Sequence, residues 1–475
     1  MRHSLRIAVI SLLCSACAVG PNYHRPSDLP DKKEVPDQYK EASAIMRPAS
    51  PADLADRGEW WRVYDDPLLD QLMVECSTAN QTLVAAEASY RQALAVLAGA
   101  KASLWPVIGA NGGVSRGNIG SGSSTTTTPG TTSRTVSTVY TAGLTASWEP
   151  DVWGRIRRTI ESDAANAQSS ADTLAATRLS LQAQLATNYA SLRIVDAQAA
   201  LLKDTVAAYE RSLTMTQNRY KAGVVAKTDV MLAQTQLLAA QAQAIDTNVL
   251  RTQLEHAIAA LIGKPPASFA LAVRLEPAMA LPDIPAGVPS QMLERRPDVA
   301  SAERLMAAAN AQIGVAVAAF FPTITLSGSN DYSSVSISDL FNLPNRVWSL
   351  GADLALTIFD GGARFAVRDQ AAAAYDQSVA NYRQTVLTAL QNVEDNLSAL
   401  RVLGQEYVVQ AEAVKAAELT TKLTINQYKA GTVSYLNVVT AQATEFTAKV
   451  TSLQIMGQRY NANIALIKAL GGGWS

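Results

Sequence analysis

Alternating apolar and polar positions predict four β-strands in this chain. The clearest alternation lies in 136–148, where the even positions are mostly apolar and the odd positions mostly small or polar, and 347–359 repeats it. Residues 107–116 and 323–332 are shorter and weaker versions. Segments of about ten residues with a period of two are typical of transmembrane β-barrels and also of a soluble antiparallel sheet with one wet face. A polar, Gly-, Ser- and Thr-rich loop at 117–135 joins the first pair, as suits the cell exterior.

Long stretches without proline predict helices much longer than these strands. We expect helices at 79–103, 155–218 and 228–262 in the first half, and at 297–319, 363–427 and 435–470 in the second. A helix over 155–218 would be about 96 Å long. One 4-3 seam in it is apolar except at Asn188 and runs Leu181, Leu185, Asn188, Leu192, Val195, Ala199, Leu202, Val206, Tyr209, Leu213. This spacing indicates coiled-coil-like packing in a tall wall of helices.

The two halves of the chain are a tandem repeat. The tetrapeptide YKAG occurs at 220–223 and again at 428–431, an offset of 208 residues, and Asn188 meets Asn396 at the same offset. An earlier register, with an offset of 216, pairs Pro106 with Pro322. We therefore expect one repeat at 79–263 and a second at 297–475. A linker, 264–296, joins them, and a segment at 17–78 precedes them.

The N-terminus has the pattern of an export signal. Arg2 and Arg6 precede an apolar run at 7–13 that is too short to span a bilayer. A small pair, Ser15-Ala16, then precedes Cys17, which resembles a bacterial lipobox with residues 1–16 as the signal peptide and Cys17 as the lipidated residue. Cys14 stands where that motif usually has leucine. A plain signal peptide with incidental cysteines is the alternative.

Composition argues against several classes of function. Forty basic and 41 acidic residues give a formal net charge of −1 without a basic block, which does not favour a nucleic-acid partner. His3 lies in the signal, and His24 and His256 are far apart, so we expect no metal site and no cofactor. No phosphate loop or nucleophile elbow is visible, so we expect no enzyme. Cys76 is interpreted as a small buried apolar residue.

Four strands are too few to close a barrel, because single-chain barrels begin at eight. An open edge in lipid leaves backbone groups unpaired, at several kcal/mol each. The chain must therefore associate, with eight strands in two copies or twelve in three, and the pattern does not choose between them. A surface-anchored lipoprotein hydrolase with helical arms and a lipid-anchored coiled-coil spacer stay open as rivals. The hydrolase lacks a convergent polar pocket, and the spacer leaves the strands unexplained.

Several longer motifs resemble one known family. They are CAVGPNYHRP at 17–26, WWRVYDDPLLDQL at 60–72, WEPDVWGRIRR at 148–158, RRPDVASAERLMAAANAQIGVAVAAFFPTITLSG at 295–328 and IFDGGARFAVR at 358–368. Together they resemble the outer membrane efflux proteins, the TolC-like family, and within it the NodT-type lipoprotein branch that works with RND-type pumps.

The resemblance implies an α+β membrane protein that forms a homotrimer. Its twelve-stranded outer-membrane β-barrel has four strands per chain, and twelve helical columns continue the barrel through the periplasm. Such a channel is a passive exit duct for drugs or other small molecules. It receives them from an inner-membrane RND-type pump and a periplasmic membrane-fusion adaptor. Ala18 after Cys17 agrees with outer-membrane sorting, and the lipidation implies palmitate and an anchor in outer-membrane lipid.

The family also gives the YKAG turns a role. Each turn lies at the tip of a helical hairpin, where Gly223 and Gly431 suit a left-handed helix end. Six tips in a trimer form a periplasmic aperture that is closed at rest and opens on complex assembly. The resemblance places Asp229, Asn437, Thr440, Tyr220 and Tyr428 at the aperture. Val224 and Thr432 join the glycines as tip residues that contact the adaptor.

Three positions depart from the family pattern at this aperture. Asn437 and Thr440 stand where members often carry aspartate, and Val433 stands where some place a latch arginine. The acidic ring, which in the family selects against anions, then rests on Asp229. The alternative interpretation of Asp229 is a residue in the first turn of a helix, favoured by the helix macrodipole.

Overall fold

The computed structural model describes residues 18–29, 38–41, 58–119, 135–274, 280–282, 284 and 295–472. The expected signal peptide, Cys17 and most of the 117–135 loop lie outside these residues. The chain divides into two compact units. Unit 1 comprises Met1–Pro26, Arg91–Ser170 and Glu303–Asn381, and unit 2 comprises Ser27–Tyr90, Ala171–Ala302 and Tyr382–Ser475.

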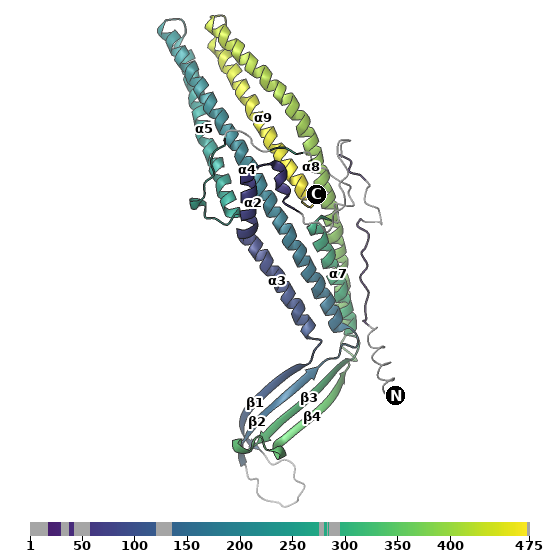
Figure 1. The fold of residues 1–475 in the computed structure, drawn as a ribbon. Coiled ribbons are helices and arrows are strands. Elements are labelled where there is room, and N and C mark those ends of the chain that lie inside the picture. Colours follow the sequence, from purple (N-terminus) through teal and green to yellow (C-terminus); the bar gives the residue numbers. More distant parts are fainter. Residues whose placement is uncertain are drawn as a thin grey trace, which may run out of the picture. The chain divides into compact units, whose positions relative to one another are not determined.

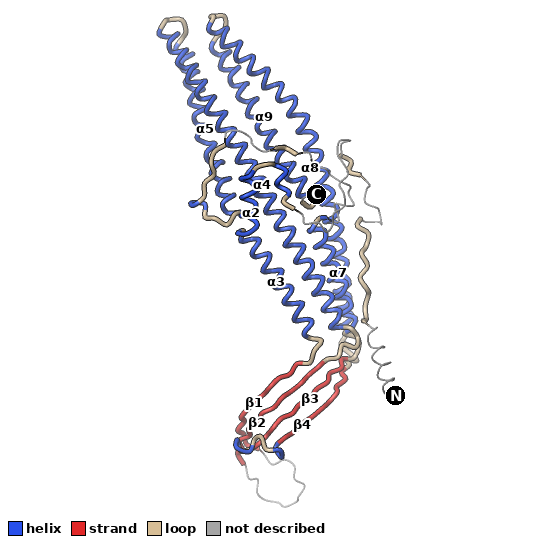
Figure 2. The backbone as a smooth tube through the Cα atoms, in the orientation of Figure 1, coloured by secondary structure: helices blue, strands red, loops and turns tan. Residues whose placement is uncertain are grey.

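Helices dominate the described residues, and all four strands belong to unit 1 (Figure 2). The helices are α2 (Pro67–Ala79), α3 (Gln81–Ala102), α4 (Arg155–Lys221), α5 (Lys227–Leu261), α7 (Pro297–Ala318), α8 (Ala363–Lys429) and α9 (Tyr435–Ala469). The strands are β1 (Val107–Ile119), β2 (Thr135–Trp148), β3 (Thr323–Ser334) and β4 (Arg346–Ala355). Short 3-10 turns lie at Trp60–Tyr64, Pro266–Ser268, Ile337–Asp339 and Leu343–Asn345.

The sheet of unit 1 is antiparallel with the strand order β1-β2-β3-β4. Its register aligns rows of like residues across the strands, because directly opposite residues share a face. One row is Ile108, Ala146, Gly328 and Leu350, and the adjacent row is Gly109, Thr145, Ser329 and Ser349. The sheet therefore has one apolar and one polar face, as the alternation predicts. Within the described residues, β1 and β4 each pair with a single neighbour and form the two edges.

Strand β4 is shorter than the sequence pattern indicates. The alternation extends to residue 359, but β4 ends at Ala355, which lies opposite Thr323, the first residue of β3. Pro322 precedes β3 and has no N–H to donate, so residues 356–359 have no strand beside them. Asp360 then begins α8: its carboxylate accepts hydrogen bonds from the backbone N–H groups of Gly362 at 3.1 Å and Arg364 at 3.2 Å.

The N-terminal part of unit 2 also differs from the expected pattern. A helix over 79–103 was expected, whereas α2 ends at Ala79 and α3 starts at Gln81. Asn80 separates them, because its side-chain Oδ1 accepts the N–H groups of Thr82 at 2.9 Å and Leu83 at 3.1 Å, the pattern of an N-cap. Helix α2 itself, which begins after its own cap Asp66, has no counterpart among the predicted elements.

The helices of the two halves match in length. Helices α4 and α8 each have 67 residues, α5 and α9 each have 35, and α3 and α7 each have 22. The starts of α3 and α7 differ by 216 positions and those of α4 and α8 by 208. The repeat is therefore structural, and its change of offset falls between β1 and α4.

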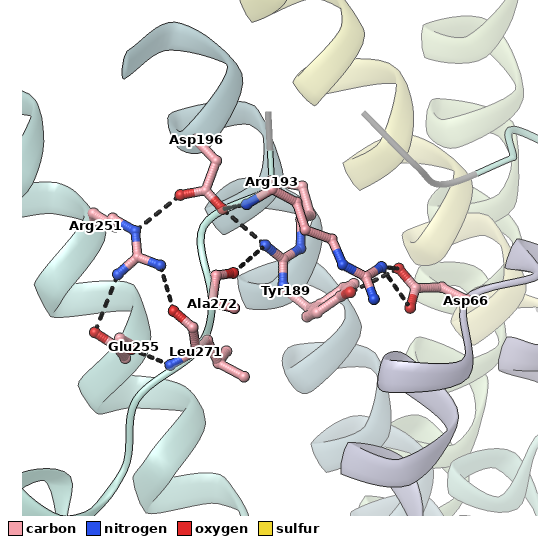
Figure 3. A network of polar contacts seen from close by, with 9 residues as sticks. Asp66, Tyr189, Arg193, Asp196, Arg251, Glu255, Leu271 and Ala272 are labelled. Carbon is pink, nitrogen blue, oxygen red and sulfur yellow. Dashed lines mark hydrogen bonds and ion pairs between the residues drawn. The ribbon is translucent and has the colours of Figure 1, made fainter. Parts of the chain in front are cut away.

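A buried ionic network in unit 2 holds the start of the linker against α4 and α5 (Figure 3). Asp196 of α4 is 0% exposed and lies between two arginines, with Arg193 Nη1 at 2.8 Å and Arg251 Nε at 2.8 Å from its carboxylate oxygens. The same guanidinium groups donate to the backbone carbonyls of Ala272 at 3.1 Å and Leu271 at 2.7 Å. Because its charges are paired and also bonded to the linker, the network fixes the path of residues 271–272.

A second carboxylate extends this network to α2. Asp66 accepts a hydrogen bond from Tyr189 Oη at 2.6 Å, and Arg274 Nη1 lies 3.4 Å from its Oδ2. The other carboxylate oxygen accepts the N–H of Leu68 at 2.9 Å and so caps α2. Three segments that are distant in sequence, α2, α4 and the linker, are thereby joined by one cap residue (Figure 3).

Substituting Asp196 is expected to destabilise unit 2 strongly. Asp196→Ala leaves Arg193 buried without a counter-charge and leaves Arg251 with Glu255 alone, and breaking a comparable buried pair costs about 3–5 kcal/mol. Thermal unfolding of the purified protein, followed by circular dichroism, is expected to shift to a clearly lower midpoint. Asp204→Ala on the exposed face of the same helix is the control and should unfold close to the wild-type midpoint. Equal midpoints for Asp196→Ala and the control would contradict this role.

Candidate functional site

Both YKAG segments end a long helix in the same way. After α4, Gly223 donates to the carbonyl of Tyr220 at 2.9 Å and Val224 donates to that of Arg219 at 2.9 Å. After α8, Gly431 donates to Tyr428 at 3.0 Å and Thr432 donates to Gln427 at 3.0 Å. These paired bonds constitute Schellman motifs, and each needs a left-handed residue at its turn.

Glycine supplies that conformation at both turns. Gly223 has φ +73° and Gly431 has φ +80°, in a region that residues with a Cβ adopt at a cost. The chain then turns within a few residues and begins α5 at Lys227 and α9 at Tyr435, so that α4 with α5 and α8 with α9 form two hairpins (Figure 1). The local sequence therefore predicts the two tips correctly.

An apolar cluster at the tips joins the two hairpins within unit 2. Its buried members are Ala233 of α5, Tyr428 of α8, and Tyr435 and Val438 of α9. The rings of Tyr428 and Tyr435 pack with their centroids 5.3 Å apart. Burial raises the pKa of the Tyr435 hydroxyl to about 12, with Tyr428 and the charge of Asp229 among the smaller causes. The hydroxyl therefore stays protonated at neutral pH.

Arg219, in the last turn of α4, bonds directly to the end of α8. Its Nη1 donates to the carbonyl of Tyr428 at 2.6 Å and to that of Lys429 at 3.2 Å. Its guanidinium carbon also lies 4.6 Å from the centroid of the Tyr428 ring. A cation at a helix C-terminus meets the negative end of the macrodipole and satisfies carbonyls that have no partner within the helix. We call this contact the Arg219 clamp.

The five predicted aperture residues occupy unlike environments. Tyr428 is 2% exposed inside the cluster, whereas its counterpart Tyr220 is 45% exposed. Asn437 and Thr440 are exposed on α9. Asp229 is half-buried in the first turn of α5, and its carboxylate makes no hydrogen bond or ion pair within the described residues.

The predicted adaptor-contact residues all lie at the tips. Gly223, Val224, Gly431 and Thr432 are exposed at the two turns. The Thr432 hydroxyl reinforces its turn, donating to the carbonyl of Gln427 at 3.0 Å. The structure thus gathers these four residues at the hairpin ends, where a second protein has access to them.

Two residues important at the tips were not singled out from the sequence. They are Arg219 and Tyr435. At the offset of 208, the equivalent of Arg219 is Gln427 and the equivalent of Tyr435 is Lys227. Those differences are visible in the aligned repeats. What the alignment does not show is that both differing residues lie where one hairpin contacts the other.

The tips carry charge but no metal-binding cluster. Lys221, Lys227 and Lys429 are exposed at or beside the two turns. Across the described residues, no group of three or more His, Cys, Asp or Glu side chains is arranged to hold a metal ion. The helices described here also contain no segment apolar and long enough to cross a bilayer.

Comparison with known proteins identifies the family. The model of the outer membrane efflux protein family matches residues 72–264 and 288–472. The pyoverdine export outer membrane protein OpmQ of Pseudomonas aeruginosa is 31% identical over 468 residues, covering 98% of this chain and 97% of that protein. The toluene efflux pump outer membrane protein TtgC of Pseudomonas putida is 31% identical over 473 residues, covering 99% and 95%.

A solved structure agrees with these relatives. The outer-membrane channel OprN superposes with a TM-score of 0.85 at 29% identity, covering 96% of this chain and all of that one. The α+β fold, the four-stranded sheet and the paired hairpins are thus those of an outer-membrane channel. The chain belongs to the outer membrane efflux protein family and acts in the outer membrane as an efflux channel.

Proposed function

We propose that three copies of this chain assemble into the exit duct of a tripartite efflux system, with the hairpin tips as its periplasmic aperture. The duct is passive: a pump in the inner membrane supplies the energy, and an adaptor protein joins pump and duct. The family membership favours this over the hydrolase and the spacer, and the geometry of unit 2 supports the assembly.

The main observation in support of the assembly is the packing of α4 against α9, which occurs once in each chain. Within unit 2, α4 packs against α9: Gln442 Nε2 donates to Ser212 Oγ at 3.1 Å, and a Cβ added at Gly457 would lie 3.4 Å from Ile194. Adding 208 to a residue number in α4 gives the equivalent residue in α8. Subtracting 208 from a residue number in α9 gives the equivalent residue in α5. The equivalent residues are Thr420 with Gln234 and Val402 with Val249.

These equivalents are exposed in the single chain. Ser212 and Gln442 are buried, whereas Thr420 and Gln234 are exposed, and Val402 and Val249 are 47% and 56% exposed. Further apolar side chains extend both faces at heptad-like spacing, with Leu238 and Ile245 on α5 and Val409 on α8. We infer that α8 of one copy packs against α5 of the next. Such a head-to-tail contact closes into a ring when the rotation allows it.

The sheet of unit 1 supports the same conclusion. Its edges, β1 and β4, present backbone groups without partners in the described chain. In lipid such edges are too costly to leave open, so β4 of one copy would pair with β1 of the next. Three copies then close a twelve-stranded barrel, the number that the family resemblance implies.

The partners and the cargo follow from this arrangement. Gly223, Val224, Gly431 and Thr432 form the surface that the periplasmic adaptor would contact, with an RND-type pump beyond it. The relatives' names refer to two different compounds, pyoverdine and toluene. We therefore propose that the duct conducts small molecules chosen by the pump. Lipidation at Cys17, with palmitate among the acyl chains, would add an anchor in the outer membrane.

Paired cysteines at the exposed faces are expected to link neighbouring copies. With Val249→Cys and Val402→Cys in one chain, oxidation should give a ladder that ends at three chains on a denaturing gel, and reductant should collapse it. The control Val249→Cys with Glu412→Cys places the second thiol about 15 Å further along α8 and should give little ladder. A ladder ending at two chains, or equal ladders from both pairs, would refute the proposed junction.

The carboxylate of Asp229 is expected to control ion selectivity at the aperture. Three copies of Asp229→Asn remove three charges, and an interaction of about 1 kcal/mol per ion corresponds to a roughly fivefold fall in the cation-to-anion permeability ratio. Reversal potentials of the purified protein in a planar bilayer measure this ratio. Asp246→Asn, an exposed carboxylate further along α5, is the control. Unchanged selectivity in Asp229→Asn would leave that residue only its place in the first helical turn.

A further inference from the structure

The contact between the hairpins of one chain rests on three residues, of which the repeat duplicates only Tyr428, as Tyr220. The Arg219 clamp bonds α4 to the end of α8, and Tyr428 and Tyr435 fill the buried cluster behind it. The Tyr435 hydroxyl also lies beside the side chain of Thr216 of α4. Charge-assisted bonds, ring stacking and burial thus act together where the two tips meet.

The equivalent contact between two copies has different chemistry. Shifted by 208 residues, Arg219 becomes Gln427, Tyr428 becomes Tyr220 of the next copy, and Tyr435 becomes Lys227 of the next copy. Glutamine has no charge for the helix C-terminus and no planar cation for the ring. A lysine in place of a buried tyrosine keeps its ammonium group in water. This second contact therefore lacks the clamp and the tyrosine pair.

The difference is concentrated at the tips. Further along the helices, the equivalent of Ile194 and Gly457 is the apolar pair Val402 and Val249, which can pack as closely as other valines do. Close to the turns, the equivalents are a glutamine, an exposed tyrosine and a lysine. The junction between copies is thus apolar along the shaft and weakly held at its end.

From this difference we infer that the aperture opens between copies, with the two hairpins of each chain moving together as a clamped pair. The inference rests on the proposed trimeric duct. Three seams of the ring, those within chains, stay closed through the Arg219 clamp. The other three seams, where Gln427 faces Tyr220 of the next copy, separate at the tips. The aperture therefore opens as three units rather than as six independently moving hairpins.

A matched pair of disulfide locks tests the inference. Ser212→Cys with Gln442→Cys replaces a side-chain contact between α4 and α9, and so bridges the two hairpins of one chain. The same positions shifted by 208 are Thr420→Cys with Gln234→Cys, which are exposed in the single chain and in the proposed trimer would bridge neighbouring copies. Each protein is reconstituted in a planar bilayer, and the frequency of channel openings is compared after oxidation and after reduction.

The two locks are expected to act differently. The lock within the chain should leave openings unchanged on oxidation. The lock between copies should suppress them at least about tenfold, and reductant should restore them. Equal suppression by both locks, or suppression by the first alone, would overturn the inference. A gel distinguishes the two proposals: if the second pair gives no bridged trimer, the proposed assembly fails, whereas bridged trimers that still open refute the inference alone.

A substitution without a disulfide provides a second test. Gln427→Arg places a guanidinium against the end of α4 of the next copy and should reproduce the clamp between copies. Openings should become roughly tenfold rarer. Gln427→Lys has the same charge without the planar fork and should have a smaller effect. Opening frequencies in Gln427→Arg equal to wild type would show that this seam does not limit opening.

Discussion

The chain has two equivalent halves, and the junction between them forms once within the chain. The two helix faces that could form a second, equivalent junction stay exposed. In this protein the made junction is α4 against α9, and the exposed faces are those of α8 and α5. In the proposed ring each face is buried against its complement on the next copy. The same constraint acts on the sheet, whose edges β1 and β4 are complementary but lie at opposite sides. The proposed ring follows from satisfying both.

The polar features of unit 2 distinguish a part held by buried charges from the hairpin tips. The network around Asp196 and the cap at Asp66 tie α2, α4, α5 and the linker together with buried, paired charges. The tips have no comparable network, and each hairpin end depends on a Schellman turn and on its contact with the neighbouring hairpin. The contact between the hairpins of one chain includes the Arg219 clamp, whereas the proposed contact between hairpins of neighbouring copies does not. The two halves therefore share a backbone fold but make hairpin contacts of unequal strength.

Much of this fold could be predicted from local pattern. Period-two alternation located the strands, proline-free stretches located the long helices, and the glycines of YKAG located both hairpin ends. The failures lay where the outcome depends on neighbours. Residues 356–359 alternate like a strand but have no partner beyond Thr323. Helix α2 was not predicted, and Asn80 separates it from α3, which starts two residues later than expected. Tyr220 and Tyr428 are identical in the motif, yet only the contact between hairpins buries one and leaves the other exposed.

The equivalence of the two junctions is tested most directly by a structure of the assembled protein in a lipid nanodisc, determined by electron cryomicroscopy. The quantity to measure is the helix pairing at the boundary between copies. The account predicts three copies, with Val402 of one beside Val249 of the next in the same relation as Ile194 to Gly457 within one chain. A boundary built from other helix faces, or an assembly that does not close at three copies, would contradict it.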